Sequence, residues 1–181
     1  RSGVKKSIRI TASFRRHLFA GISCSLISVG TAAEVKFQDP LDTPAATRIS
    51  LASRPFQAIA HAGTRIVAVG SRGLIVGSDD GGKAWNQAKV PVQTDLLAVN
   101  FPTPLEGWAV GHNGVVLHST DGGKSWVKQL DGRTAAESFK AYYATHSDIP
   151  EAGSALSQLE QNFKAGPALP YLDVWFESPQ K

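Results

Sequence analysis

The sequence predicts an all-β fold made of repeated four-stranded antiparallel units, and three observations predict it. Two segments repeat at an offset of 41 residues, so that Val69 to Trp85 align with Val110 to Trp126 without a gap. Within each copy the apolar runs are short, rich in β-branched residues and separated by glycine-containing turns, as strands are. Each copy also ends in the pattern Ser-x-Asp-x-Gly-x-x-Trp. A period of about 40 residues is typical of stacked supersecondary units.

The first 33 residues predict a cleaved export signal. Residues 1–17 hold six basic residues and no acidic one, Leu18 to Gly30 form an apolar run, and Thr31-Ala32-Ala33 supplies the small residues of a cleavage site. As a helix the run reaches about 20 Å, short of the roughly 30 Å of a hydrocarbon core. We therefore expect a chain that begins near Glu34, has no transmembrane span, and lies in the periplasm or an equivalent exported space.

Charge and cysteine content narrow the function of the exported chain. The whole sequence has a net charge of +4, but without residues 1–33 it holds 13 Lys and Arg against 15 Asp and Glu. No basic arm remains for nucleic acid. The one cysteine, Cys24, falls within the predicted signal, so thiolate catalysis is excluded from the exported part.

After a leading segment at 34–55, residues 56–131 are predicted to form two complete blades of a β-propeller fragment. The turn between the second and third strands is Ser71-Arg72-Gly73 in the first copy and His112-Asn113-Gly114 in the second, where Asn-Gly supplies the positive φ of a hairpin turn. In the second copy the four strands are expected at 96–101, 107–111, 115–119 and 125–129.

The turn between the third and fourth strands is predicted to be an Asp-box hairpin. In this pattern the Asp carboxylate accepts hydrogen bonds from backbone N–H groups ahead of it, a glycine takes the left-handed conformation, and the tryptophan covers the turn. These residues are therefore assigned a structural role rather than the role of paired glycosidase carboxylates. They are Ser78, Asp80, Gly82, Trp85, Ser119, Asp121, Gly123 and Trp126.

Residues 132–169 interrupt the repeat and are predicted to be a two-helix insert. Thr134-Ala-Ala-Glu137 has the capping-box form and starts a helix through about Tyr143. Apolar residues at helical spacing, from Ala155 to Phe163, line one face of a second helix. Residues 170–181 then open a third blade, because Leu172 to Phe176 matches Leu97 to Phe101; the sequence stops there, and we expect the protein to continue.

The wider pattern resembles a known family. Phe37 to Ala45, the Ala-Val-Gly-x-x-Gly motif of each copy, and Asp95 to Val99 are similar to the photosystem II assembly factor family, whose repeat unit is called the Ycf48-like or Hcf136-like domain. The resemblance implies a propeller of seven Asp-box (BNR) blades that binds proteins without a cofactor. It covers residues 37–131 and resumes at 172, but not the helical insert.

The sequence therefore predicts a non-enzymatic exported scaffold that binds and helps assemble a membrane protein complex. No catalytic, cofactor-binding or metal-ligating residue is assigned, since His112 and His118 have no carboxylate or thiol at ligand spacing. The alternative is a sialidase-like glycoside hydrolase with its catalytic residues in other blades. Family members that bind a photosystem subunit are expected to use a basic patch, yet the arginines here show no cluster along the sequence. Candidate partner-binding residues are Arg72, His112, Phe139, Tyr142 and Tyr143.

Overall fold

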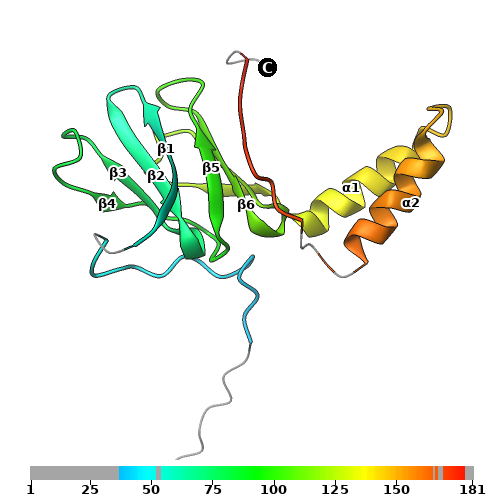
Figure 1. The fold of residues 1–181 in the computed structure, drawn as a ribbon, viewed down its shortest axis with the longest axis horizontal. Helices are drawn as coiled ribbons and strands as arrows, with labels where there is room; N and C mark the ends of the chain where they lie inside the picture. The colour runs from blue at the N-terminus through cyan, green and yellow to red at the C-terminus, as the bar shows by residue number, and fades with distance from the viewer. Residues whose placement is uncertain (1–36, 52–53, 165, 167–168, 178–181) are drawn as a thin grey trace, which may run out of the picture. The chain divides into compact units, whose positions relative to one another are not determined.

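The computed structural model describes residues 37–51, 54–164, 166 and 169–177, and in this part the chain forms two four-stranded antiparallel sheets followed by a helical hairpin (Figure 1). The predicted fold class, a propeller fragment with a short helical insert, is confirmed. The predicted export signal at 1–33 lies outside the described residues.

Each sheet has its strands in sequence order. The first holds β1 (Phe56–Ala62), β2 (Arg65–Gly70), β3 (Ile75–Ser78) and β4 (Asn86–Gln87). The second holds β5 (Leu96–Asn100), β6 (Gly107–Gly111), β7 (Val116–Ser119) and β8 (Val127–Leu130). The pairing shifts register at the same place in both sheets, between Phe56 and Ala58 and between Leu96 and Ala98. The repeat seen in the sequence is therefore a repeat of register as well.

The turns between the second and third strands are one-turn 3₁₀ helices, η1 (Ser71–Gly73) and η2 (His112–Gly114). Each has a central non-glycine residue at positive φ, Arg72 at 57° and Asn113 at 60°. The glycine that follows is also left-handed, and at Gly73 a side chain would place its Cβ 2.0 Å from the carbonyl oxygen of Val92. Only glycine fits this close approach to the neighbouring connection.

The Asp-box hairpins are held by hydrogen bonds within each turn. In the second sheet, Asp121 Oδ1 accepts from the Ser119 hydroxyl at 2.8 Å and from the backbone N–H groups of Lys124 and Ser125 at 2.9 and 3.0 Å. The Trp126 indole N–H donates to the carbonyl oxygen of Gly123 at 3.2 Å. The first sheet repeats this arrangement with Ser78, Asp80, Gly82 and Trp85. The four Asp-box glycines all have positive φ: Gly81, Gly82, Gly122 and Gly123.

The core lies between the two sheets, where β5 packs against β1 and β2. The leading segment closes one end of this core, since Leu41 is 1% exposed and belongs to the same buried cluster. Its backbone is tied to the connection between the sheets: Ala45 N–H donates to Val90 O at 2.9 Å and Gln93 N–H to Pro40 O at 2.7 Å. The leading segment is therefore an integral part of the domain.

The two sheets are packed differently where the second strand pairs with the third, at Val67 and Gly77 in the first sheet and at Trp108 and His118 in the second. In the first sheet Gly77 leaves space for the guanidinium of Arg65, which pairs with Asp79. In the second sheet the position equivalent to Gly77 is His118, whose ring stacks on Trp108 with centroids 4.3 Å apart. The space beside the third strand is thus filled by the Arg65 side chain, from the start of β2, in the first sheet. In the second sheet it is filled by the stacked rings of Trp108 and His118.

The helical hairpin consists of α1 (Gly132–Thr145) and α2 (Ala152–Phe163), which pack against each other. The prediction that Thr134 caps the first helix is wrong. The N-cap is Asp131, whose carboxylate accepts from the backbone N–H of Arg133 and Thr134, while the Thr134 hydroxyl accepts from Asp131 N–H. Thr134 is thus the N3 residue of a capping box that begins three residues earlier. In the part of the chain that the structure describes, neither helix is long and apolar enough to span a membrane.

Residues 172–176, predicted as the first strand of a third blade, form no strand within the described chain. Tyr171 N–H donates to Gly111 O at 3.0 Å, and the Phe176 ring lies 4.6 Å from the Trp108 ring. The segment therefore returns to β6 and covers the outer side of the second sheet. A strand exists only through its backbone pairing, and a sequence that matches a first strand does not supply the neighbours with which it would pair.

Candidate protein-binding surface

The two 3₁₀ turns lie together at one end of the sheets, here called the turn end. Asp95 joins them, because its carboxylate accepts from Arg72 N–H at 2.8 Å and its carbonyl oxygen accepts from His112 N–H at 2.9 Å. The helical hairpin starts at the same end, where Gly114 closely approaches Gly132. The predicted partner-binding residues Arg72 and His112 are thus placed on adjacent, rigid turns of the two blades.

Three arginines surround a hollow of about 180 Å³ beside the first of these turns. Arg48 and Arg54 come from the leading segment and Arg72 from η1, and the apolar part of the wall comes from Pro55 and Leu74. We call this site the arginine hollow. The arginines show no cluster along the sequence, but the leading segment brings two of them to the turn that carries the third.

Local hydrogen bonds hold the leading segment in this place. Arg48 N–H donates to the Gln87 side-chain oxygen at 2.9 Å, and the Gln87 amide donates back to Ala46 O at 2.9 Å. Arg54 N–H closes a turn onto Leu51 O at 3.3 Å. The backbone carrying Arg48 is thereby attached to the edge strand β4, so that Arg48 lines the same hollow as Arg72 without any regular spacing between them in the sequence.

The arginine hollow is a concentration of positive charge. Within the described residues, none of the side chains of Arg48, Arg54 and Arg72 forms an ion pair with a carboxylate. Arg54 and Arg72 are exposed, and Arg48 is half-buried. A guanidinium binds a carboxylate through two parallel N–H···O bonds, so converging guanidinium groups suit an acidic peptide or a chain terminus.

The aromatic candidates lie apart from the arginine hollow, on the helical hairpin. Tyr142 stacks on His146 with ring centroids 4.2 Å apart and meets the edge of Tyr143 at 5.4 Å. Phe139 and Tyr143 line a groove of about 260 Å³ between the two helices. Phe139 and Tyr142 are 43% and 49% exposed. The structure therefore separates the five candidates into a charged group on the blade turns and an aromatic group on the hairpin.

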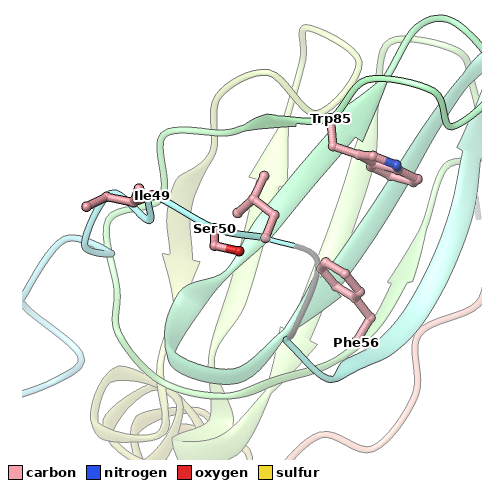
Figure 2. Close-up of a pocket in the computed structure, with 5 residues that line it drawn as sticks. Ile49, Ser50, Phe56 and Trp85 are labelled. Carbon is pink, nitrogen blue, oxygen red and sulfur yellow. The ribbon is translucent and has the colours of Figure 1, made fainter.

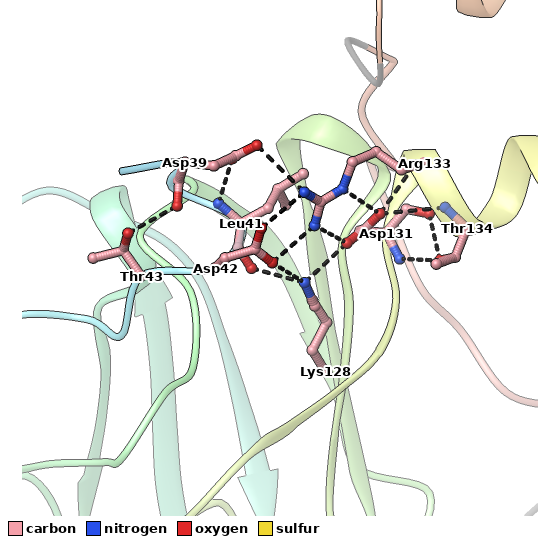
Figure 3. Close-up of polar contacts among 8 residues, drawn as sticks. All are labelled: Asp39, Leu41, Asp42, Thr43, Lys128, Asp131, Arg133 and Thr134. Carbon is pink, nitrogen blue, oxygen red and sulfur yellow. Dashed lines mark hydrogen bonds and ion pairs between the residues drawn. The ribbon is translucent and has the colours of Figure 1, made fainter. Parts of the chain in front are cut away.

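A polar cluster fixes the start of the hairpin against the leading segment (Figure 3). Asp131, 2% exposed, pairs with Arg133 at 2.7 Å and with Lys128 at 2.9 Å. The same two cations pair with Asp42 of the leading segment, at 2.8 Å and 3.0 Å. Lys128 also donates to the carbonyl oxygen of Leu41 at 2.8 Å. The leading segment, β8 and α1 are thus held by one network of charges.

The charges of this cluster stabilise one another. The hydrogen bond from Arg133, followed by that from Lys128, holds the pKa of Asp42 well below its usual range. The Arg133 hydrogen bond likewise depresses the pKa of Asp131, against an opposing effect of burial. The pKa of Arg133 is raised by its bonds to Asp42 and Asp131. All the members are therefore ionised at neutral pH, and the hairpin is fixed by a permanently charged junction.

The Asp-box carboxylates are acceptors that stabilise turns. The backbone N–H of Ala84 and the hydroxyl of Ser78 lower the pKa of Asp80. For Asp121, burial raises the pKa, but hydrogen bonds from Ser125, Ser119 and Lys124 outweigh it, so the net shift is downward. A glycosidase acid needs the opposite, a raised pKa. Among the described residues no cluster of three His, Cys, Asp or Glu side chains could hold a metal ion.

Both sheets fall within a region that is similar to known proteins. Residues 54–138 match the family model described as photosynthesis system II assembly factor YCF48. Similar solved structures include "YCF48 bound to D1 peptide", at 28% identity and a TM-score of 0.40, covering 49% of this chain and 33% of that one. Another is YCF48 from Cyanidioschyzon merolae, at 26% identity and a TM-score of 0.37, covering 46% of this chain and 29% of that one. The chain thus spans about a third of the length of these structures, and no curated protein matches it.

The match is to a family of assembly factors and agrees with the prediction that the chain is not an enzyme; the glycoside hydrolase alternative gains no support from it. The matched residues begin just before β1 and end within the first turns of α1, so they comprise both sheets. Residues 54–138 form a Ycf48-like domain.

Proposed function

We propose that this chain is an exported, non-enzymatic scaffold that binds an acidic segment of a protein partner at the arginine hollow and so helps to assemble a membrane complex of the photosystem II type. The observation that carries the proposal is that Arg48, Arg54 and Arg72 line one hollow while, among the described residues, none of their side chains forms an ion pair with a carboxylate. The family match of residues 54–138 supports the role in assembly.

The geometry favours binding over chemistry. The hollow lies between η1, whose backbone is bonded to Asp95, and the leading segment, whose backbone at Arg48 is bonded to Gln87, so little conformational entropy is lost when a partner binds. Its positive charge steers an acidic partner and makes binding sensitive to salt. The aromatic group on the hairpin, in which Phe139 and Tyr142 are exposed and Tyr143 is half-buried, supplies a second contact, since aromatic side chains dominate binding hot spots.

Export is part of this proposal and is supported by the sequence alone. Residues 1–33 have the basic start, apolar run and small-residue end of a cleaved signal. Export would bring the scaffold to the periplasmic or equivalent side of a membrane, where the exposed segments of membrane subunits are accessible. N-terminal sequencing of the secreted protein tests it: a start at Glu34 is expected, and a retained, uncleaved N-terminus contradicts it.

Charge reversal tests the arginine hollow. The triple variant Arg48→Glu, Arg54→Glu, Arg72→Glu is compared with a control of equal charge change, Lys83→Glu, Lys89→Glu, Lys124→Glu, whose side chains are exposed. The probe is the set of proteins captured from detergent-solubilised envelope membranes, quantified by mass spectrometry. We expect the hollow variant to lose its membrane-protein partner at least about tenfold, since each charge-assisted contact is worth about 1.5–3 kcal/mol. The control variant should retain the partner.

Two results contradict the proposal. If the wild type and the hollow variant capture the partner equally, the three arginines do not bind it. If the hollow variant and the lysine control lose the partner equally, the loss is caused by the change in net charge and not by the arginine hollow. Retention of a glycan with no protein partner would instead favour the hydrolase alternative. A third variant, Phe139→Ser with Tyr142→Ser, separates the hairpin contribution, which we expect to be smaller than that of the arginines.

A further inference from the structure

The groove between the two helices, here called the hairpin groove, lies outside the repeat. The family match ends at residue 138, within α1, and every residue that lines this groove of about 260 Å³ comes after it. The lining residues are Phe139, Tyr143, Ala155, Gln158, Leu159 and Asn162. The walls of the hairpin groove are therefore not positions at which one blade packs on the next.

The apolar hollow beside the first sheet is different in this respect (Figure 2). Two residues that line it, Phe56 and Trp85, correspond in the repeat to Leu96 and Trp126 of the second sheet. Both of these residues are buried in the core between the two sheets. The hollow of Figure 2 thus has the position of a contact between blades, whereas the hairpin groove has no counterpart in the repeat.

α1 supplies an aromatic wall to the hairpin groove. Phe139 and Tyr143 are four residues apart on this helix, which places them about 6 Å apart along its axis. Phe139 is 43% exposed, and Tyr143 is half-buried. Ala155 and Leu159, from α2, are also half-buried. The two helices therefore leave apolar surface accessible between them.

α2 supplies two side-chain amides to the same groove. Gln158 and Asn162 are also four residues apart, and so about 6 Å apart along the axis of α2. Both are exposed. Among the described residues of the hairpin, the side-chain hydrogen bonds lie at the two ends of α1 and at Ser154, so they engage neither amide. Each amide can donate through its NH₂ group and accept through its oxygen.

These two walls match the repeat of an extended peptide. In an extended chain, alternate residues point to the same side and lie about 6.4–6.8 Å apart, close to the interval of the two amides and of the two rings. A helical ligand would not use the amides, because its backbone N–H and C=O groups are already bonded to each other. None of the six lining residues is charged, so a charged side chain would find no partner in the groove.

We propose that the hairpin groove binds an extended, uncharged segment of a partner protein in which every second side chain is apolar. Gln158 and Asn162 bind the backbone of this segment, and the apolar side chains pack against Phe139, Tyr143 and Leu159. The inference rests on the proposed function and deepens it, since it assigns the chemistry of the second contact. The partner then presents an acidic segment to the arginine hollow and an apolar, extended segment to the hairpin groove.

Selection from a peptide library tests the hairpin groove. The probe is a displayed library of random linear peptides, which is selected on the whole chain, and the affinity of each selected peptide is measured by fluorescence anisotropy. We expect a class of uncharged peptides with apolar residues at alternate positions. Methylating one alternate set of their backbone nitrogens should weaken binding about tenfold, because that set donates to the amides, and methylating the other set should not.

A matched pair of variants locates the binding. Gln158→Leu with Asn162→Leu, the groove variant, removes both amides. The control is Ser157→Leu with Gln161→Leu, which places two leucines at the same spacing on exposed positions of α2 that do not line the groove. We expect the groove variant to bind the uncharged peptides about tenfold more weakly than the wild type, and the control to bind them equally well. Circular dichroism establishes that each variant is folded.

The outcomes separate this inference from the proposed function. A selection that yields no uncharged class overturns the hairpin groove, as does a class whose apolar residues recur at the three- and four-residue spacing of a helix. Uncharged peptides that bind the groove variant and the control equally also overturn it. Acidic peptides that bind the groove variant but not the triple arginine variant support the arginine hollow whatever happens at the groove. If only the uncharged class is found, and it depends on both amides, the hairpin groove is supported and the arginine hollow is not.

Discussion

Replacing Asp131 tests the junction between the blades and the hairpin. This side chain is 2% exposed, caps α1 by accepting from the backbone N–H groups of Arg133 and Thr134, and pairs with both cations of the polar cluster. Loss of an N-cap costs about 1 kcal/mol. Loss of the charged contacts adds about 1–2 kcal/mol, a reduced figure because Lys128 is 24% and Arg133 38% exposed and both keep Asp42. Asp131→Ala is therefore expected to lower the free energy of unfolding by about 2–3 kcal/mol.

Asp131→Asn separates the two effects. Asparagine is as good an N-cap as aspartate but has no charge, so this variant should retain the cap and lose only about 1–2 kcal/mol. The assay is urea unfolding followed by circular dichroism, with Glu137→Ala, an exposed residue of α1, as a control expected within about 0.5 kcal/mol of the wild type. The reasoning fails if Asp131→Ala unfolds at the same urea concentration as the wild type, or if the Asn and Ala variants are equally damaged.

Three further changes have definite expected outcomes. Gly73→Ala forces a Cβ to 2.0 Å from Val92 O at a φ of +69° and should lower the free energy of unfolding by more than about 3 kcal/mol. Gly153→Ala, in open space within α2, should instead raise the free energy of unfolding by about 0.5–1 kcal/mol. Thermal unfolding compares the two variants. Asp121→Ala, which removes the acceptor of the second Asp box, should lower stability by about 1–2 kcal/mol in urea unfolding, and an unchanged midpoint would exclude its bonds to Lys124 and Ser125 as a source of stability. Acid should lower the free energy of unfolding. The depressed pKa of Asp131 gives stability that is present above about pH 4 and is lost as the pH falls below it. When unfolding is measured from pH 7 to pH 2, the free energy of unfolding of Asp131→Asn should therefore depend less on pH than that of the wild type.

The sheets could be predicted because their signals are local. Each Asp box is a contiguous run whose hydrogen bonds join residues two to four apart, such as Asp121 to Lys124 and Ser125. The turns at Arg72 and Asn113 are likewise set by the glycine that follows them. Duplication at a fixed offset then made each signal visible twice, and the strand pairing followed from it.

The arginine hollow could not be predicted, because its members meet only through tertiary contacts. Arg48 lines the same hollow as Arg72 because Gln87 binds the backbone of the leading segment, and nothing in the spacing of these residues indicates it. The start of α1 was misplaced for a different reason. Thr134-x-x-Glu137 has the usual capping-box form, whereas the box that forms pairs Asp131 with Thr134, and Asp131 is held at this place by its buried ion pairs.

The contrast between Gly77 and His118 shows how the two blades have become non-interchangeable. A designer who averaged them into one consensus blade would place a histidine at position 77, where its Cβ would lie 2.3 Å from the Arg65 guanidinium. Copying the second blade into the first would require three coordinated exchanges: Gly77→His, Val67→Trp to supply the stacked partner, and loss of the Arg65 side chain. Each alone would overfill or empty the same volume. The effects of exchanges at these three sites on stability are therefore expected to be coupled, even though the two Asp boxes are nearly identical.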